Sequence, residues 1–118
     1  MRISLEFNKA PNYLVVKVTG KWTTEDILMS IEDIKTEADK QEVKLILLDL
    51  QGLSLPESEM TRFYSGVKIA STFGPSYQVA GYSQSEKINR YAETVAVNRA
   101  ANFKMFSCEA DAKNWLQI

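Results

Sequence analysis

Apolar and polar side chains alternate along two early stretches of the chain. Residues 3–7 (ISLEF) and 13–20 (YLVVKVTG) show this alternation, which is typical of half-buried strands, and the short polar gap between them predicts a hairpin. Residues 43–50 (VKLILLDL) are almost continuously apolar, which predicts a strand buried on both faces at the centre of a sheet. Apolar runs at 77–82 and 103–106 predict a fourth and a fifth strand.

A spacing of three to four residues between apolar side chains predicts two helices between these strands. The first follows Thr23, a predicted N-cap, and places apolar residues on one face over residues 27–38. The second ends at Gly74 and Pro75, because glycine readily terminates a helix and proline cannot continue one. Its predicted core-facing stripe consists of Met60, Phe63, Tyr64, Val67 and Ala70.

Two further helices complete the pattern. Ser83 and Glu86 have the spacing of a capping box, which predicts a third helix from that point, and Ser107 is the predicted cap of a last helix that carries Trp115. The elements therefore follow the order ββαβαβαβα. That order predicts one α/β domain over residues 1–118, with a mixed, mostly parallel sheet of about five strands flanked by four helices.

The composition narrows the range of functions. Of the 118 residues, 45% are hydrophobic and 25% are charged, and the formal net charge of −1 gives no electrostatic footprint for nucleic acid. No apolar run reaches the length of a membrane span, and the opening residues lack the apolar core of a signal peptide, so we expect a cytoplasmic protein. The single cysteine, Cys108, agrees with a reducing compartment.

The chain contains no histidine. This removes Ser-His-Asp and Cys-His catalysis, and it removes the imidazole ligands that most zinc sites use. Cys108 has no second cysteine and no obvious base near it in the sequence, so we expect an unreactive thiol. We therefore expect a protein that is not an enzyme and that carries neither a metal nor a cofactor.

The stretch between the central strand and the second helix, residues 49–59 (DLQGLSLPESE), has two interpretations. Ordinary turn and cap chemistry accounts for its composition: Ser58 stands at the helix start, and Glu57 and Glu59 complement the helix dipole. The spacing of its residues also fits a switch, because a phosphate on Ser58 would add about −1.5 to −2 charges at the start of a helix.

This spacing resembles that of STAS domains, the family named for sulfate transporters and anti-sigma factor antagonists. In that family the central strand runs into Asp-Leu-Ser-Gly-Val, then three variable positions, then Asp or a similar residue and Ser. Here Asp49, Gly52 and Ser58 match the pattern without a gap. The order of strands and helices and the ending FKMFSCEADAKNWL are also similar to those of divergent STAS-like bacterial proteins.

The resemblance implies a regulatory role. In anti-sigma factor antagonists the serine that matches Ser58 is phosphorylated by a partner kinase, so we expect Ser58 to be a regulatory phosphorylation site. A protein partner such as an anti-sigma factor or a kinase would contact the switch loop and the start of the second helix. The residues of this expected surface are Asp49, Gly52, Ser54, Glu57, Glu59 and Arg62.

An alternative from another class is a binding module for a small apolar or lipid-like ligand, because divergent STAS-like proteins resemble lipid-carrier folds. The second helix offers apolar side chains for such a pocket, and they would equally suit an ordinary core. These side chains are Met60, Phe63, Tyr64, Val67 and Phe73. The unpaired edge of the predicted hairpin is also compatible with a homodimer.

Overall fold

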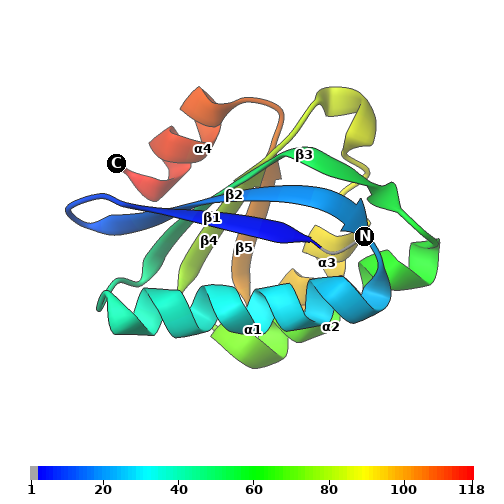
Figure 1. The fold of residues 1–118 in the computed structure, drawn as a ribbon, viewed down its shortest axis with the longest axis horizontal. Coiled ribbons are helices and arrows are strands. Elements are labelled where there is room, and N and C mark those ends of the chain that lie inside the picture. Colours follow the sequence, from blue (N-terminus) through cyan, green and yellow to red (C-terminus); the bar gives the residue numbers. More distant parts are fainter. Residues whose placement is uncertain (1–2) are drawn as a thin grey trace.

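The computed structural model describes residues 3–118, which form one five-stranded sheet and four α-helices (Figure 1). In chain order the elements are β1 (Ser4–Lys9), β2 (Tyr13–Trp22), α1 (Thr24–Lys40), β3 (Leu45–Pro56), α2 (Glu59–Phe73), β4 (Gln78–Tyr82), the 3₁₀ turn η1 (Ser85–Lys87), α3 (Tyr91–Asn98), β5 (Asn102–Phe106) and α4 (Glu109–Leu116). This order confirms the predicted α/β architecture.

The sheet keeps the order of the chain, β1-β2-β3-β4-β5. β1 pairs antiparallel with β2, and the other three strand pairs are parallel. Parallel crossovers share one hand, so α1, α2 and α3 lie together on one face of the sheet, and α4 alone covers the other (Figure 1). On the right of Figure 1, β2 and β3 end and α1 and α2 begin, and this is the carboxyl edge of the sheet.

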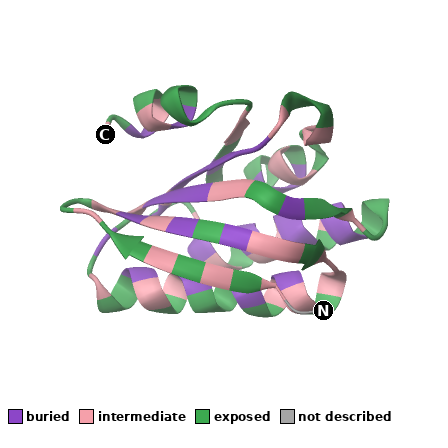
Figure 2. Cartoon of the chain, turned by 45° about the horizontal axis from the view of Figure 1, so that its top comes forward, coloured by how far each residue is buried: buried purple, intermediate pink, exposed green. Residues whose placement is uncertain are grey.

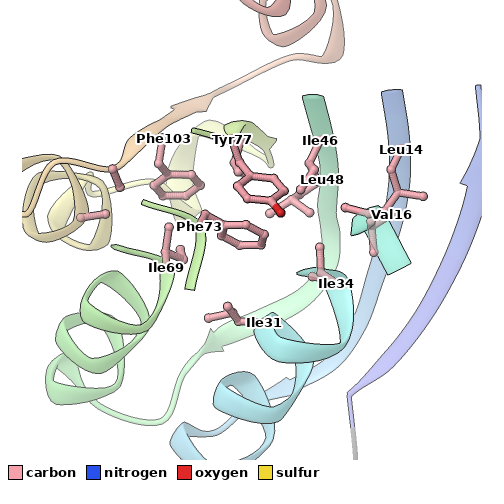
Figure 3. Packing of buried hydrophobic residues seen from close by; sticks show 14 of the residues in the cluster. Leu14, Val16, Ile31, Ile34, Ile46, Leu48, Ile69, Phe73, Tyr77 and Phe103 are labelled. Carbon is pink, nitrogen blue, oxygen red and sulfur yellow. The ribbon is translucent and has the colours of Figure 1, made fainter. Parts of the chain in front are cut away.

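The main hydrophobic core lies between the sheet and the helices α1, α2 and α3 (Figure 3). Leu14, Val16 and Ile46 are completely buried there. A smaller cluster lies under α4 and consists of Leu47, Ala80, Tyr82, Ala112 and Leu116. β3 contributes to both clusters, as its apolar sequence predicts, whereas the edge strand β1 carries only exposed and half-buried residues (Figure 2).

β3 is much longer than its apolar run predicts, and this changes the nature of the stretch 49–59. Pairing with β2 continues through Thr19 with Gly52, Gly20 with Leu53, and Trp22 with Pro56. Two register shifts along this pair each give β3 an extra residue, which is the signature of a β-bulge. Most of the predicted linker is therefore strand, because bulges let a polar, irregular sequence keep its backbone pairing.

The predicted capping box at Ser83 is wrong. Ser83 is buried, and its hydroxyl donates to the carbonyl of Leu50 (3.4 Å) and to the side-chain oxygen of Gln84 (3.0 Å). After it comes only the 3₁₀ turn, and α3 starts at Tyr91, preceded by Arg90 in the left-handed region with a φ of 60°. The Ser83 side chain is turned inward toward Leu50, so its oxygen is not placed to accept a bond from a helix N–H.

The other predicted helix ends have mixed outcomes. Thr23 is confirmed as the N-cap of α1, where its hydroxyl accepts a bond from the Asp26 N–H. Gly74 is confirmed as the residue that ends α2. Ser107 is not the cap of α4, because Cys108 occupies that position and makes no side-chain cap bond. Adjacent candidates such as these two cannot be separated by sequence spacing alone.

Two further properties bear on function. None of the described helices combines the length and the apolar character that are needed to cross a membrane. Within residues 3–118, no group of three or more Cys, His, Asp or Glu side chains is arranged so that it could hold a metal ion. Cys108, the only cysteine in the chain, is exposed and free.

Candidate functional site

The N-termini of α1 and α2 lie next to each other at the carboxyl edge of the sheet (Figure 1). Hydroxyl groups join them: Thr24 Oγ1 lies 2.9 Å from Thr61 Oγ1, which in turn lies 3.2 Å from Ser58 Oγ. The backbone N–H of Thr24 also donates to a carboxylate oxygen of Glu57 at 2.9 Å. Two helix ends, each with a positive partial charge, therefore meet on one small surface.

Ser58 is the N-cap of α2 and is exposed. Its hydroxyl oxygen accepts a bond from the Thr61 N–H at 3.3 Å. A phosphate at this position would lie where the helix dipole favours negative charge. The exposed carboxylates of Glu57 and Glu59 flank it on both sides and would oppose that charge. Ser58 is thus exposed at the surface. The helix dipole would stabilise a phosphate there, and the two carboxylates would destabilise it.

The stretch before Ser58 is held to β2 and is not a free loop. Ser54 Oγ accepts a bond from the Trp22 N–H at 3.1 Å and donates to the Leu55 carbonyl at 2.9 Å. Further along, the Glu57 N–H donates to the Trp22 carbonyl at 3.0 Å. Both ends of this segment therefore have fixed positions relative to the starts of α1 and α2.

The N-terminal half of α2 turns polar side chains toward the interior. Thr61, Arg62 and Ser65 are all buried. The indole N–H of Trp22 donates to Ser65 Oγ at 3.0 Å, and Ser65 Oγ donates to the Thr61 carbonyl at 2.6 Å. The guanidinium carbon of Arg62 lies 5.4 Å from the centre of the Trp22 ring. Hydrogen bonds and a cation–π contact, rather than apolar packing, thus join this part of α2 to the end of β2.

The outer face of the same half-helix is apolar. Met60 is 51% exposed and Tyr64 is 44% exposed, while Phe63 and Val67 are half-buried. Of the five residues proposed for an apolar pocket, only Phe73 lies in the core. The predicted stripe is therefore on the wrong side of the helix over most of its length. Phe73 lines a cavity beneath α2, and Met60, Phe63, Tyr64 and Val67 do not line it.

Gly66 explains the orientation of α2 and is the signal that periodicity missed. A Cβ atom at this position would lie 2.6 Å from the Ala92 carbonyl oxygen and 2.8 Å from Val95 Cβ, so α2 and α3 touch here through the bare glycine. Glycine is unfavourable inside a helix unless a close contact requires it. That requirement marks the Gly66 side of α2 as the packed side.

The comparisons with known proteins concern structure only. Neither a family model nor a curated relative matches this sequence. An anti-sigma factor antagonist from Mycobacterium paratuberculosis matches with a TM-score of 0.67 and 13% identity, over 98% of this chain and 95% of that one. A protein of the DUF3478 family from Shewanella loihica PV-4, described as having a SpoIIAA-like fold, matches with a TM-score of 0.60 and 23% identity, over 98% and 94%.

The phosphorylated form of the Bacillus cell fate determinant SpoIIAA also matches, with a TM-score of 0.53 and 12% identity, over 96% of this chain and 99% of that one. The chain has a STAS-like fold. At these identities the similarity establishes the fold and transfers no residue roles.

Within the STAS-like fold, Asp49 belongs to the opposite side of the sheet from α2. It pairs in register with Tyr82, which lies in the cluster under α4, and Asp49 Oδ1 accepts a bond from the Gln51 N–H at 3.0 Å. Burial, together with the nearby carboxylates of Asp49 and Glu109, raises the pKa of Tyr82 to about 12. Asp49 therefore faces α4 and is separated by the sheet from the helix-start cluster.

Gly52 has a packing role in the STAS-like fold, and its backbone is not in the left-handed region. It pairs with Thr19 of β2, and a Cβ atom on it would lie 2.6 Å from Thr19 Cγ2. Glycine at this position thus lets the two strands approach closely at a bulge. Gly52 therefore lies within β3, although turn chemistry was one of the two interpretations of residues 49–59.

Arg62 also differs from the expected surface, because it is buried beneath α2. Its neighbour Glu59 is exposed and places its two carboxylate oxygens 3.4 Å from Arg62 Nε and 3.4 Å from Asn89 Nδ2. The structure brings four of the predicted site residues together on one exposed surface: Ser54, Glu57, Ser58 and Glu59. The chemistry of that surface is hydroxyls and carboxylates at two helix starts.

Proposed function

We propose that this STAS-like domain is a non-enzymatic, cytoplasmic regulatory module that binds a protein partner such as an anti-sigma factor or a kinase. Its contact surface, here called the α2 surface, consists of Leu55, Met60 and Tyr64 around Ser58. Phosphorylation of Ser58 weakens the binding. Two of the proteins with similar structures support a regulatory role, since one is an anti-sigma factor antagonist and one is a phosphorylated cell fate determinant.

The reversed polarity of α2 is the observation that carries this proposal. Leu55 is 57% exposed, and Met60 and Tyr64 are about half exposed, whereas Thr61, Arg62 and Ser65 of the same segment are buried. Met60 and Tyr64 lie one turn apart on the same helix, and contiguous exposed apolar patches mark interaction sites. This apolar group adjoins the exposed N-cap, so a change at Ser58 acts directly on the same surface.

The charges around the α2 surface determine how a phosphate on Ser58 would act. Glu57 and Glu59 are both exposed beside Ser58. Like charges that face each other across an interface weaken binding. A phosphate would add about −1.5 to −2 charges to this acidic rim, and the helix dipole would offset only about 0.3–1 kcal/mol of the repulsion within the rim. The phosphate would then repel acidic groups of the partner, and its hydration would oppose burial of the neighbouring apolar side chains.

A photo-crosslinking experiment in the native cell tests the surface. A crosslinking amino acid replaces Tyr64 in one strain and the exposed Ser76, at the opposite end of α2, in a control strain. A discrete crosslinked species is expected from position 64 only. The substitution Ser58→Asp should reduce its yield, and Ser58→Ala, which loses an N-cap worth about 1 kcal/mol, should not. Equal crosslinking from both positions would contradict the proposed surface.

Intact-mass analysis of the protein from its own cells tests the switch separately. The expected result is a fraction of the chains with one phosphate, which fragmentation places on Ser58. A phosphate on another residue, or bare chains under every growth condition that yields the crosslink, would contradict a Ser58 switch. Such a result would not affect the proposed binding surface, which the crosslinking experiment tests separately.

A further inference from the structure

A cavity of about 90 Å³ lies in the layer between the sheet and the helices α1 and α2. Its deep walls are apolar and come from the sheet and both helices: Val18, Ile31, Leu48, Leu53, Ile69 and Phe103. At the carboxyl edge its lining includes the exposed residues Leu55 and Arg90, so its mouth is there. An apolar interior with charged groups at one end is the general form of a site for a small organic ligand.

Arg62 lines this cavity although only 6% of the residue is exposed. The Glu59 carboxylate comes within 3.4 Å of its Nε without hydrogen-bond alignment, and the Glu59 side chain is 67% exposed. Within residues 3–118 the buried Nε therefore has no hydrogen-bond acceptor. A buried guanidinium donor without an acceptor lowers stability unless a ligand supplies one.

Lys87 brings a second positive charge to the cavity. Its Nζ donates to the backbone carbonyls of Gln51 and Leu53, each at 3.3 Å. None of the ion pairs among residues 3–118 includes Lys87. An ammonium group that is bonded only to neutral oxygens keeps its full charge for an approaching anion.

The other two charged residues that line the cavity neutralise each other. Arg90 Nη1 donates to Glu93 Oε1 at 3.0 Å, and the same oxygen accepts a bond from the Met105 N–H at 2.6 Å. Glu59, beside Arg62, is the remaining carboxylate. Two cations, Arg62 and Lys87, thus stand against one exposed carboxylate, so the mouth favours an anion.

We propose that this cavity binds a small amphipathic carboxylate, with its apolar chain inside and its carboxylate accepting a hydrogen bond from Arg62 close to Lys87. Bonds between a guanidinium and a carboxylate are among the strongest and most directional in proteins. This proposal also explains why the inner face of α2 is polar, because that face places the charge of Arg62 at one end of the apolar cavity. This binding does not rest on the proposed partner, although Leu55 belongs to both the cavity mouth and the α2 surface.

The size of the cavity limits the ligand. A dry apolar cavity of about 150 Å³ holds a benzene molecule, so about 90 Å³ admits only the end of an alkyl chain. The rest of the chain would lie in the mouth, where Leu55 and Ile88 contribute apolar surface. A straight, medium-length carboxylate such as decanoate fits these requirements and serves as the probe.

The two tryptophans provide the readout for a titration of the full chain with decanoate by nuclear magnetic resonance. The indole N–H signal of Trp22, which lines the cavity, should shift and saturate. The signal of Trp115, which packs against Phe106 under α4, should not shift. Decanol and decyltrimethylammonium should bind at least about tenfold more weakly, as expected for the loss of one charge-assisted hydrogen bond.

Two methionine substitutions locate the anion site. Arg62→Met keeps the length of the side chain and removes its charge, so decanoate affinity should fall at least about tenfold while decanol affinity stays the same. Arg99→Met is the matched control, because Arg99 lies over the outer Phe63 ring at 5.4 Å and does not line the cavity. If Arg62→Met does not fold, Lys87→Met serves the same comparison.

Three results would overturn the inference. The first is the absence of a saturable Trp22 shift with decanoate. The second is equal affinity for decanoate and decanol, which would show that no anion is recognised. The third is an equal loss of decanoate affinity in Arg99→Met and in the cavity variant, which would place the effect outside the cavity.

Discussion

The layer between the sheet and the helices α1 and α2 has two unlike ends. At the amino edge, Phe73 and Tyr77 pack edge to face with their ring centres 5.5 Å apart, and the Tyr77 hydroxyl closes the end by donating to Asp39 (Figure 3). At the carboxyl edge, the buried side chains include Thr61 and Arg62. One end is closed by two aromatic rings, and the other holds a polar network beside a cavity.

This difference separates stability from function within one small core. Burial of apolar side chains stabilises a domain. Buried polar groups contribute much less, because their hydrogen bonds mainly replace the bonds to water that they lose on burial. A sequence under selection for stability alone would fill both ends in the same way. The polar end coincides with the carboxyl edge, where the helix starts and Ser58 lie, so the loss of apolar packing falls where a function is expected.

The apolar part of the core should respond most strongly to mutation. Ile46 is completely buried, so Ile46→Ala leaves a cavity and should lower the free energy of unfolding by about 2–5 kcal/mol. Urea denaturation measures this change. Leu55→Ala, at a position that is 57% exposed, is the control and should change it by no more than about 0.5 kcal/mol. A cost below about 1 kcal/mol for Ile46→Ala would mean that the comparison between the two ends is mistaken.

The contact between α2 and α3 should be nearly as sensitive. Gly66→Ala would force a Cβ to within 2.6 Å of the Ala92 carbonyl oxygen, a backbone atom that cannot yield cheaply. The free energy of unfolding should fall by about 1–3 kcal/mol, although alanine is the better helix former by about 1 kcal/mol. Ser71→Ala, at an exposed position on the same helix, should be neutral or slightly stabilising. A stabilising Gly66→Ala would show that the two helices are not in close contact.

The opposite face of the sheet allows a test by pH. Burial beside Asp49 and Glu109 raises the pKa of Tyr82 from its ordinary value of 10 to about 12. The folded protein then holds this proton more tightly than the unfolded chain, so stability is lost as the pH rises from 10 to 12. Tyr82→Phe should remove that part of the slope. An unchanged slope in Tyr82→Phe would contradict the burial of the Tyr82 hydroxyl beside Asp49.

The sequence predicted the apolar end far better than the polar one. The continuous apolar run ending at Leu50 identified the central strand, because burial on both faces leaves few polar positions. The bulges that extend β3 to Pro56 could not be recognised in the sequence, because their residues are of the kinds that also form turns. Ser83 failed as a cap for a similar reason: a hydroxyl bonded to a strand has the same sequence appearance as one that caps a helix.

The candidate site shows the same limit. Ser58 was predictable as a helix start from its position before an amphipathic segment. The orientation of α2 was not, because Met60 and Tyr64 are apolar and exposed while Thr61 and Ser65 are polar and buried. A prediction from apolar periodicity assigns the apolar side of a helix to the core, so it is wrong for a helix whose apolar side is exposed and whose polar side is buried. Gly66 did indicate which side of α2 is packed, because a glycine inside a helix suggests a close contact there, but apolar periodicity does not take glycine into account.

Arg62→Met should have the smallest effect on stability. The substitution removes a buried charge, fills a similar volume and leaves behind only Glu59, whose side chain is 67% exposed and stays hydrated. Replacing a buried ion by an apolar side chain of similar size is often neutral or stabilising. The free energy of unfolding should therefore stay within about 1 kcal/mol of the original value or rise. Thr61→Val is the contrasting variant and should lose about 1–3 kcal/mol, because it breaks the hydroxyl contacts to Thr24 and Ser58.

Comparing Thr61→Val with Arg62→Met shows whether the buried polar groups at the carboxyl edge stabilise the fold or serve binding. A costly Thr61→Val with a neutral Arg62→Met would divide the buried polar groups into two kinds, one that joins the helix starts and one that the fold does not need. If the fold does not need Arg62, its free buried donor beside the apolar cavity supports the proposal of an anionic ligand. If Arg62→Met instead costs about 3 kcal/mol, the guanidinium supports the fold through the Trp22 ring, and the anionic ligand then has to be tested by the decanoate and decanol affinities of Lys87→Met.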